Sequence, residues 1–192
     1  MRALRQAIKE SGIGIGTDIV KVSSFLNHGL NTGLLFEMGE AVARHFEADH
    51  PELVMTVEAS GIALALTTAH ALGNLPVVFC KKTPAKNLDD ASYTTSCTSF
   101  TRGTNYMMRC EKNLIKPNTR VLIVDDFLAN GAAIRGMLDI ISQAQAIPVG
   151  AAVAIEKGFQ PGGQQLRHEG IKLLSLSIVQ EIRDGVIHLK DD

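Results

Sequence analysis

Two adjacent acids follow a strongly apolar run near the middle of the chain. The run at 121–124 predicts a short strand buried on both faces, and Asp125 and Asp126 come directly after it. In open α/β sheets ligands bind outside the carboxyl ends of the strands, so acids at this point have a chemical use. Their side chains diverge on an extended backbone, and we expect them to bind the hydroxyl groups of a sugar.

A loop of small residues after the acids predicts a phosphate site. Backbone N–H groups at the start of a helix bind phosphate, and small side chains let the anion come close. A helix is predicted over 134–145 from its apolar spacing. The alternative is an ordinary strand-to-helix turn with solvated acids. The loop consists of Ala129, Asn130, Gly131, Ala132 and Ala133.

Strands and helices alternate along the chain in the pattern that would position this site. Apolar runs predict strands at 53–57, 77–80, 121–124 and 148–155. Helical spacing predicts helices at 2–10, 34–48, 62–72 and 134–145. This alternation is typical of an α/β protein with a doubly wound parallel sheet, and 192 residues suit one domain.

Composition argues against several classes of function. A net charge of −1 gives no general reason to bind nucleic acid or an anionic membrane. No apolar run approaches the about 20 residues of a membrane span. Three cysteines without metal-type spacing, and an N-terminus without an apolar signal core, fit a reducing compartment. We therefore expect a soluble cytoplasmic protein.

Other polar candidates follow the remaining predicted strands. Ser60 and Gly61 stand just before a helix, where a second phosphate group could bind backbone amides. Lys81 and Lys82 follow the second strand and could neutralise such an anion. Without their position, these residues would be read as an ordinary helix start and as solvated surface lysines.

Residues near the fourth strand suit a flat heterocycle. Phe159 can stack on an aromatic base, while Lys157 can donate to an oxo group and Asn27 can both donate and accept. The glycine-rich segment 12–18 does not follow a buried strand, so no dinucleotide-binding loop is expected there. The polar segment 86–109 fits a mobile lid or an exposed hairpin equally well.

The strand, paired acids and small-residue loop resemble the phosphoribosyl pyrophosphate motif of type I phosphoribosyltransferases. The loop departs from the commoner Thr-Gly-Gly-Thr ending. The 5′-phosphate would therefore be bound more by backbone amides than by side-chain hydroxyls. In this form the chain is similar to the purine members of the family that act on xanthine. Further agreeing segments occur in the expected order at 21–22, 24–28, 58–63, 125–131 and 155–162.

The resemblance implies transfer of a 5-phosphoribosyl group from its pyrophosphate donor to xanthine in purine salvage, forming XMP and pyrophosphate. It implies a homodimer and Mg²⁺ held by the pyrophosphate, with no direct protein ligand. Asp125 and Asp126 would be the catalytic acids. The donor would also contact Ser60, Gly61, Lys81 and the loop 129–133. The residues assigned to xanthine are Val20, Asn27, Lys157 and Phe159.

The resemblance also implies structural details. The core would span approximately 34–156, and a small hood would combine approximately 1–33 with 157–192. A flexible loop at approximately 86–109 would close over the reacting centre. Family members often have a strained peptide bond in the segment before Gly61, and a cis bond between Ala59 and Ser60 would mark such a constraint if found.

Two alternatives stay open. The base could instead be guanine or hypoxanthine, whereas adenine would place an amino donor against Lys157. A regulator could use the same pocket as a phosphoribosyl pyrophosphate sensor, but it would need a DNA-binding module for which this near-neutral chain offers no sign.

Overall fold

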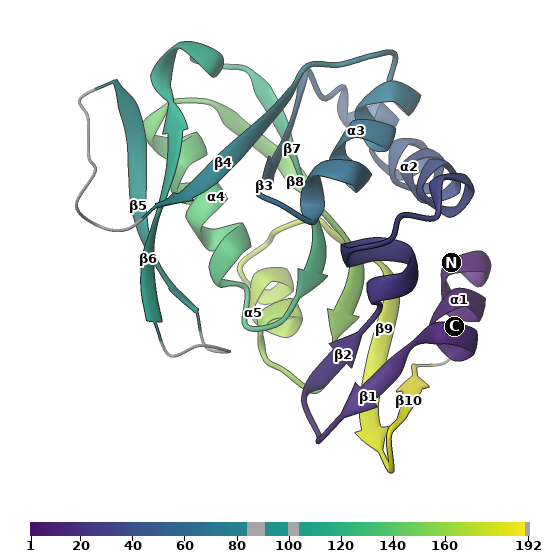
Figure 1. Ribbon diagram of the computed structural model, residues 1–192. Helices are drawn as coiled ribbons and strands as arrows, with labels where there is room; N and C mark the ends of the chain where they lie inside the picture. The colour runs from purple at the N-terminus through teal and green to yellow at the C-terminus, as the bar shows by residue number, and fades with distance from the viewer. Residues whose placement is uncertain (84–90, 100–103, 191–192) are drawn as a thin grey trace.

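An eight-stranded, mostly parallel sheet forms the centre of the molecule in this computed structural model, which describes residues 1–83, 91–99 and 104–190 (Figure 1). The strand order is β10-β9-β8-β7-β3-β4-β6-β5, and β1 and β2 form a separate antiparallel pair. The strands are β1 (Ile13–Ile15), β2 (Ile19–Lys21), β3 (Leu53–Val57), β4 (Val77–Thr83), β5 (Ser92–Ser99), β6 (Thr104–Glu111), β7 (Arg120–Leu128), β8 (Ile147–Lys157), β9 (Leu173–Arg183) and β10 (Val186–Leu189).

Five α-helices accompany the strands of the described chain. They are α1 (Arg2–Ser11), α2 (Thr32–Phe46), α3 (Gly61–Ala71), α4 (Ala132–Gln143) and α5 (Gly162–His168), and shorter turns of helix occupy Ser23–Asn27, Glu47–Asp49 and Lys112–Leu114. Within the described ranges, no helix is long and apolar enough to span a membrane.

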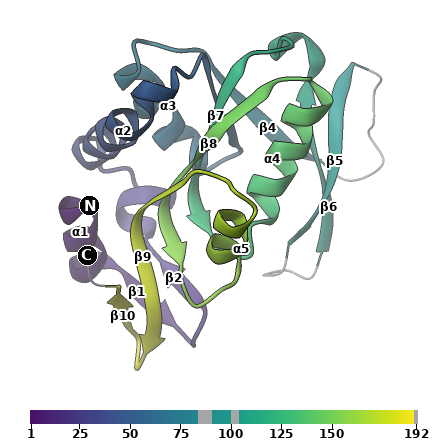
Figure 2. The same ribbon diagram turned by 180° about the vertical axis from the view of Figure 1, so that it is seen from behind.

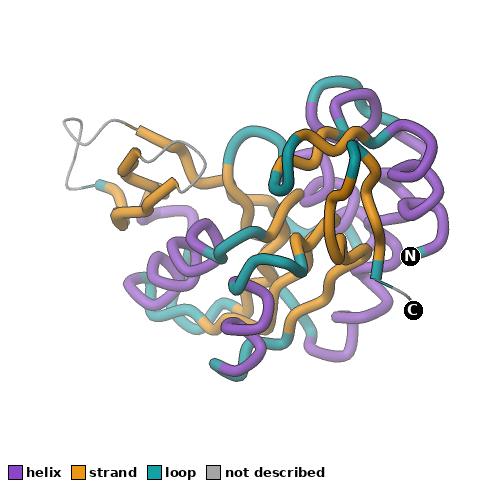
Figure 3. Tube along the Cα trace, turned by 90° about the horizontal axis from the view of Figure 1, so that it is seen from below, coloured by secondary structure: helices purple, strands orange, loops and turns teal. Residues whose placement is uncertain are grey.

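The central strands are apolar on both faces because helices cover both. Along β7, Leu122 and Val124 belong to the core cluster under α2 and α3, whereas Val121 and Ile123 belong to the cluster under α4. Seen from behind, α4 and α5 lie in front of the sheet, and the view from below shows helices on either side of the strands (Figures 2 and 3). The predicted α/β class with a doubly wound parallel sheet is confirmed.

Two elements differ from the prediction, and a third agrees with one of two open alternatives. Strand β7 continues through both acids to Leu128 by pairing with β8, so the acids lie within the strand and not after it. The C-terminal residues Leu173–Arg183 form β9, a full strand of the main sheet that pairs parallel with β8. In the polar segment 86–109, β5 and β6 pair antiparallel, in agreement with the hairpin alternative; 86–90 and 100–103 lie outside the described residues.

The two ends of the chain come together at one edge of the sheet. Helix α1 and the β1–β2 pair lie beside β9 and β10 in both ribbon views (Figures 1 and 2). The backbone of Gly14 in β1 donates a 3.1 Å hydrogen bond to Gly185 O in the β9–β10 turn. This packing places the β1–β2 turn near the carboxyl ends of the central strands.

Candidate active site

The loop between β7 and α4 has the backbone of an anion cradle. Gly131 adopts a left-handed conformation, with φ 86°, and α4 begins at the next residue. The side chain of Asn130 folds back, and its Oδ1 accepts a 3.1 Å hydrogen bond from the N–H of Ala132. A left-handed residue strongly favours glycine, which explains Gly131 at this point of the loop.

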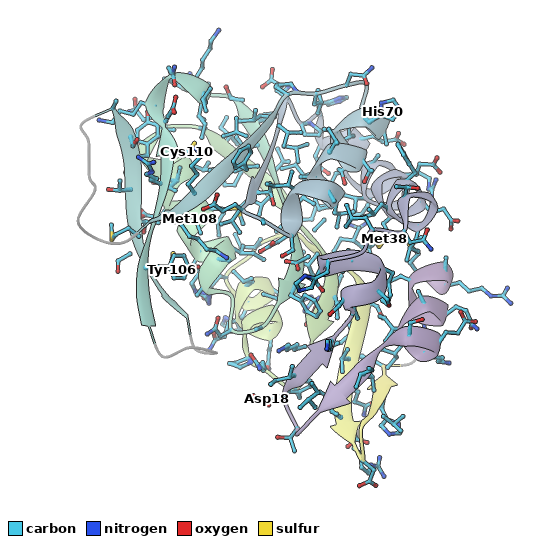
Figure 4. All side chains as sticks on the ribbon, viewed as in Figure 1. Asp18, Met38, His70, Tyr106, Met108 and Cys110 are labelled. Atoms are coloured by element: carbon cyan, nitrogen blue, oxygen red, sulfur yellow. The ribbon has the colours of Figure 1, made fainter. Side chains whose placement is uncertain are left out.

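A cavity of about 230 Å³ lies in front of this loop. All five predicted loop residues line it, together with Lys157. Polar side chains from other elements complete the wall. These are Asp18 from the β1–β2 turn, Lys82 from β4, Tyr106 from β6 and Gln160 after β8. Figure 4 labels Asp18 and Tyr106, which reach the cavity from two distant parts of the chain.

The paired acids lie on β7 just before the loop, and neither is among the residues that line the cavity; their environments differ. Both are buried, with 4% of Asp125 and 8% of Asp126 exposed. Asp126 Oδ2 accepts a 2.6 Å hydrogen bond from Asn27 Nδ2, while Asp125 Oδ1 accepts one of 2.9 Å from the N–H of Asp126. Burial and the charge of Asp126 raise the pKa of Asp125 well above its ordinary value, an effect that the Lys82 charge partly opposes.

We expect Asp125→Asn to raise the thermal stability of the free protein at pH 7. Because the pKa of Asp125 is raised, its ionisation costs free energy in the folded state. Asparagine keeps an Oδ1 acceptor for the N–H of Asp126 but carries no charge. A rise of about 2 to 4 °C in melting temperature is expected, as for roughly 1 kcal/mol in a protein of this size.

The gain has a defined pH dependence. Asp125 ionises near its ordinary pKa of 3.8 when unfolded and at higher pH when folded, so the penalty is absent below pH 3.8 and grows as the pH rises through the folded pKa. Melting curves of the variant and the wild type should separate toward pH 7 and converge as the pH falls to 3.8. Asp139→Asn, at an exposed acid of α4, is the control, and a gain that is equal at every pH would contradict this origin.

Of the two lysines, Lys82 faces this cavity, whereas the prediction named Lys81 as the donor contact. Lys82 lines the cavity, and its Nζ lies 5.6 Å from the centre of the Tyr106 ring. Lys81 points to the opposite face of β4 and lines a different cavity with Phe79 and Arg109. Neighbouring side chains on a strand alternate between its faces, so only one lysine of the pair can face the site.

The small residues after β3 lie directly against the acids. A Cβ added to Gly61 would stand 2.8 Å from Asp125 Oδ1 and 2.3 Å from Thr56 Oγ1, so this approach requires glycine. Ser60 is the N-cap of α3 and is half-buried. In the described part of the chain, a cis peptide bond lies between Glu58 and Ala59, one bond before Ala59–Ser60.

The residues predicted to contact a heterocycle divide into two groups. Lys157 lines the cavity, and its Nζ donates a 2.7 Å hydrogen bond to Asp18 O. Burial lowers the pKa of Lys157, and the charge of Asp18 opposes the shift. Asn27 reaches the site through Asp126. Val20 is buried and Phe159 half-buried in the core cluster under α2 and α3, and neither lines this cavity.

Sequence reasoning missed three polar residues of the cavity wall. Asp18 lies in the glycine-rich segment 12–18, Tyr106 in the polar hairpin, and Gln160 in the turn before α5. Burial, followed by contact with Cys97, raises the pKa of Tyr106 to about 12, so its hydroxyl stays protonated at neutral pH. The position of Gln160 just after a predicted strand could have indicated that it lies at the site. Asp18 and Tyr106 are brought to the cavity by packing between segments far apart in the sequence, which no local pattern indicates.

Comparison with known proteins places this site in a family. A model of the phosphoribosyl transferase domain matches residues 30–172, which include the acids, the phosphate loop and Lys157. The chain belongs to the phosphoribosyl transferase domain family. Two similar relatives are named xanthine phosphoribosyltransferase. The one from Laribacter hongkongensis is 42% identical over 98% of this chain and 99% of the relative; the one from Clostridioides difficile is 42% identical over 99% and 100%.

Solved phosphoribosyltransferases share the fold at low sequence identity. The adenine phosphoribosyltransferase of Rhodothermus marinus superposes with a TM-score of 0.73 at 20% identity, covering 93% of this chain and 99% of the other. The enzyme from Trypanosoma brucei also gives 0.73, at 16% identity over 90% and 78%. These likenesses support the architecture and carry no information about the base.

Proposed function

We propose that the chain transfers a 5-phosphoribosyl group from 5-phosphoribosyl 1-pyrophosphate to xanthine, forming XMP and pyrophosphate in purine salvage. The observation that carries the proposal is that two buried acids on β7 are followed directly by the phosphate loop, which lines a cavity together with Lys157. Xanthine is favoured because relatives of nearly equal length and 42% identity bear that name. The match covers 99% and 100% of the length of these two relatives.

In this account the protein accelerates the reaction by positioning the reactants and by stabilising charge electrostatically. Breaking the ribose C1–O bond develops positive charge on the sugar and negative charge on the leaving pyrophosphate. Asp125 and Asp126 hold the ribose hydroxyls, and the amides of the loop 129–133 hold the 5′-phosphate. The backbone around Ser60 and Gly61, with the Lys82 ammonium, receives the pyrophosphate. Holding both reactants in line lowers the entropic cost of the transfer.

The site has the charge that suits Mg²⁺ carried by the donor. Two buried carboxyl groups, Asp125 and Asp126, stand side by side at this point of β7. Burial and the neighbouring charge of Asp126 raise the pKa of Asp125, and a nearby cation would favour its ionised form. Carboxylates and phosphates are the ligand types that Mg²⁺ prefers, often through water. When bound to the pyrophosphate, Mg²⁺ neutralises leaving-group charge.

The base lies between the cavity and the N-terminal segment in this proposal. Lys157 donates to an oxo group of the purine, and the Asn27 side chain contacts another edge. Phe159 and Val20 supply apolar contact from the core beneath. We further propose a cytoplasmic homodimer, a core at approximately 34–156 and a hood made of approximately 1–33 and 157–192.

Lys82→Met is expected to lower kcat/KM for the donor by about ten- to a hundredfold, because it removes positive charge near the leaving pyrophosphate. Lys81→Met is a matched control on the same strand and is expected to leave the value within about twofold. Steady-state kinetics with varied donor concentration measure both. Equal losses in the two variants would contradict the assignment of Lys82.

The direct test of the proposed function is product identification. Purified protein is incubated with the donor, xanthine and Mg²⁺, and XMP and pyrophosphate are quantified. The proposal predicts equal amounts of both products and loss of turnover with a chelator. A sensor would bind the donor without forming either product, and that result would refute the enzymatic role.

A further inference from the structure

Helix α5 packs directly against the phosphate loop. The N–H of Gly162 donates a 3.2 Å hydrogen bond to Ala129 O. A Cβ added to Gly162 would stand 2.4 Å from Ala129 O and 2.6 Å from the N of Gly131. The loop that lines the cavity therefore rests on the backbone at the start of α5.

Arg135, in the first turn of α4, joins the same contact. Its Nη2 donates to Glu169 Oε1 at 2.7 Å and to Gln165 Oε1 at 3.3 Å. Its Nη1 is buried and has no hydrogen-bond partner within the described residues. That atom would stand 3.1 Å from a Cβ added to Gly131, so the positive guanidinium lies against the middle of the phosphate loop.

The opposite side of α5 is anchored beside the base-binding segment. Arg167 makes a two-pronged ion pair with Glu156, with distances of 2.9 and 2.7 Å, and Ser175 donates to the same carboxylate. Burial raises the pKa of Glu156, but the bonds from Arg167 and Ser175 outweigh it, and the pKa is lowered. Glu156 immediately precedes Lys157, so α5 connects the phosphate loop with that residue.

The positive charge of Arg135 and its contact with the phosphate loop give this residue a role beyond its ion pair with Glu169. The side chains of Arg135 and Glu169 are 36% and 50% exposed, and pairs of that exposure contribute little to folding stability. The effect of the pair should therefore fall on the loop that the guanidinium touches. A planar guanidinium can hold Glu169 and Gln165 with one nitrogen and face the loop with another, which an ammonium cannot reproduce.

We propose that Arg135 is a positioning residue for the phosphoribosyl donor. Its ion pair with Glu169 holds α5 against the loop, and its charge lies behind the amides that receive the 5′-phosphate. This inference rests on the proposed function, because it assigns the loop to the donor. It adds that donor affinity depends on a contact outside the cavity.

Calorimetric titration with the donor and Mg²⁺, without base, tests this directly on four variants. Arg135→Met should raise the donor Kd about tenfold. Arg135→Lys, which keeps the charge, and Glu169→Gln, which keeps the arginine, should each cause a smaller loss. Arg44→Met removes a longer and more exposed pair with Glu40, 3.6 Å apart on α2, and should leave the donor Kd unchanged.

Kinetics separate positioning from a general structural role. The account predicts a raised KM for the donor in Arg135→Met, a KM for xanthine within about twofold of wild type, and an unchanged melting temperature. The inference would be overturned if Arg135→Met bound the donor with the Kd of the wild type. It would also be overturned if both KM values rose equally and the melting temperature fell. If Arg135→Met does not fold, Arg135→Lys and Glu169→Gln decide. Wild-type protein that does not bind the donor would refute the proposed function instead.

Discussion

Asp126→Asn lowers kcat about a hundredfold or more in our account, while the protein stays folded. Asparagine has nearly the same shape as aspartate but no charge to stabilise the positive ribose in the transition state, and losing one preorganised electrostatic contact costs about that factor. The new side-chain amide keeps an oxygen that can accept the hydrogen bond from Asn27 Nδ2. Steady-state kinetics at saturating donor and base give the result.

Thermal melting of the same variant provides the control. The melting temperature should stay within about 3 °C of wild type, since the buried hydrogen bond survives. Asp139→Asn, at an exposed acid of α4, should retain full activity. Unchanged kinetics in Asp126→Asn would remove the role that we give to this carboxylate.

Gly162→Ala should destabilise the protein and disturb the phosphate loop. The new methyl group would overlap Ala129 O at 2.4 Å, the carbonyl carbon of Asn130 at 2.5 Å and the N of Gly131 at 2.6 Å. These are backbone atoms and cannot rotate away, so either α5 or the phosphate loop must shift. We expect a loss of about 1 to 3 kcal/mol in the free energy of unfolding, and weaker donor binding.

Denaturant unfolding and donor titration measure the two effects. Gly33→Ala is the matched control, because the nearest atom to its added Cβ is 3.6 Å away and the residue lies in α2. That change should be neutral or stabilising, since alanine favours a helix over glycine by up to about 1 kcal/mol. If Gly162→Ala behaved like Gly33→Ala, the close contact of α5 with the loop would be contradicted.

The local pattern of the sequence predicted most of the fold. Each predicted strand and helix occurs, with ends shifted by up to a few residues, because apolar periodicity reflects which faces are buried. The extension of β7 through the acids depends on pairing with β8, which no local pattern records. The loop 129–133 was predictable because a tight turn into a helix and a close approach of phosphate to the backbone both require small residues and a glycine, which the local sequence shows.

The rest of the site depends on packing between distant segments. Asn27 and Asp126 are 99 positions apart, and their hydrogen bond requires the N-terminal segment to fold over the sheet. To choose between Lys81 and Lys82, one must know which side chains of β4 point toward the site. The uninterrupted apolar run before the two lysines shows no alternation from which this could be predicted. Asp18 reaches the cavity only because β1 packs beside β9 and β10.

The most direct test of the central claim is pyrophosphate release with xanthine, guanine, hypoxanthine and adenine compared side by side. Each base is supplied with the donor and Mg²⁺, and kcat/KM is measured. The account predicts the highest value for xanthine and the lowest for adenine, whose 6-amino group would meet the donor Lys157. A preference for guanine or hypoxanthine would support the phosphoribosyl transfer but contradict xanthine as the substrate. If no base gave pyrophosphate release although the donor binds, the enzymatic function would be contradicted.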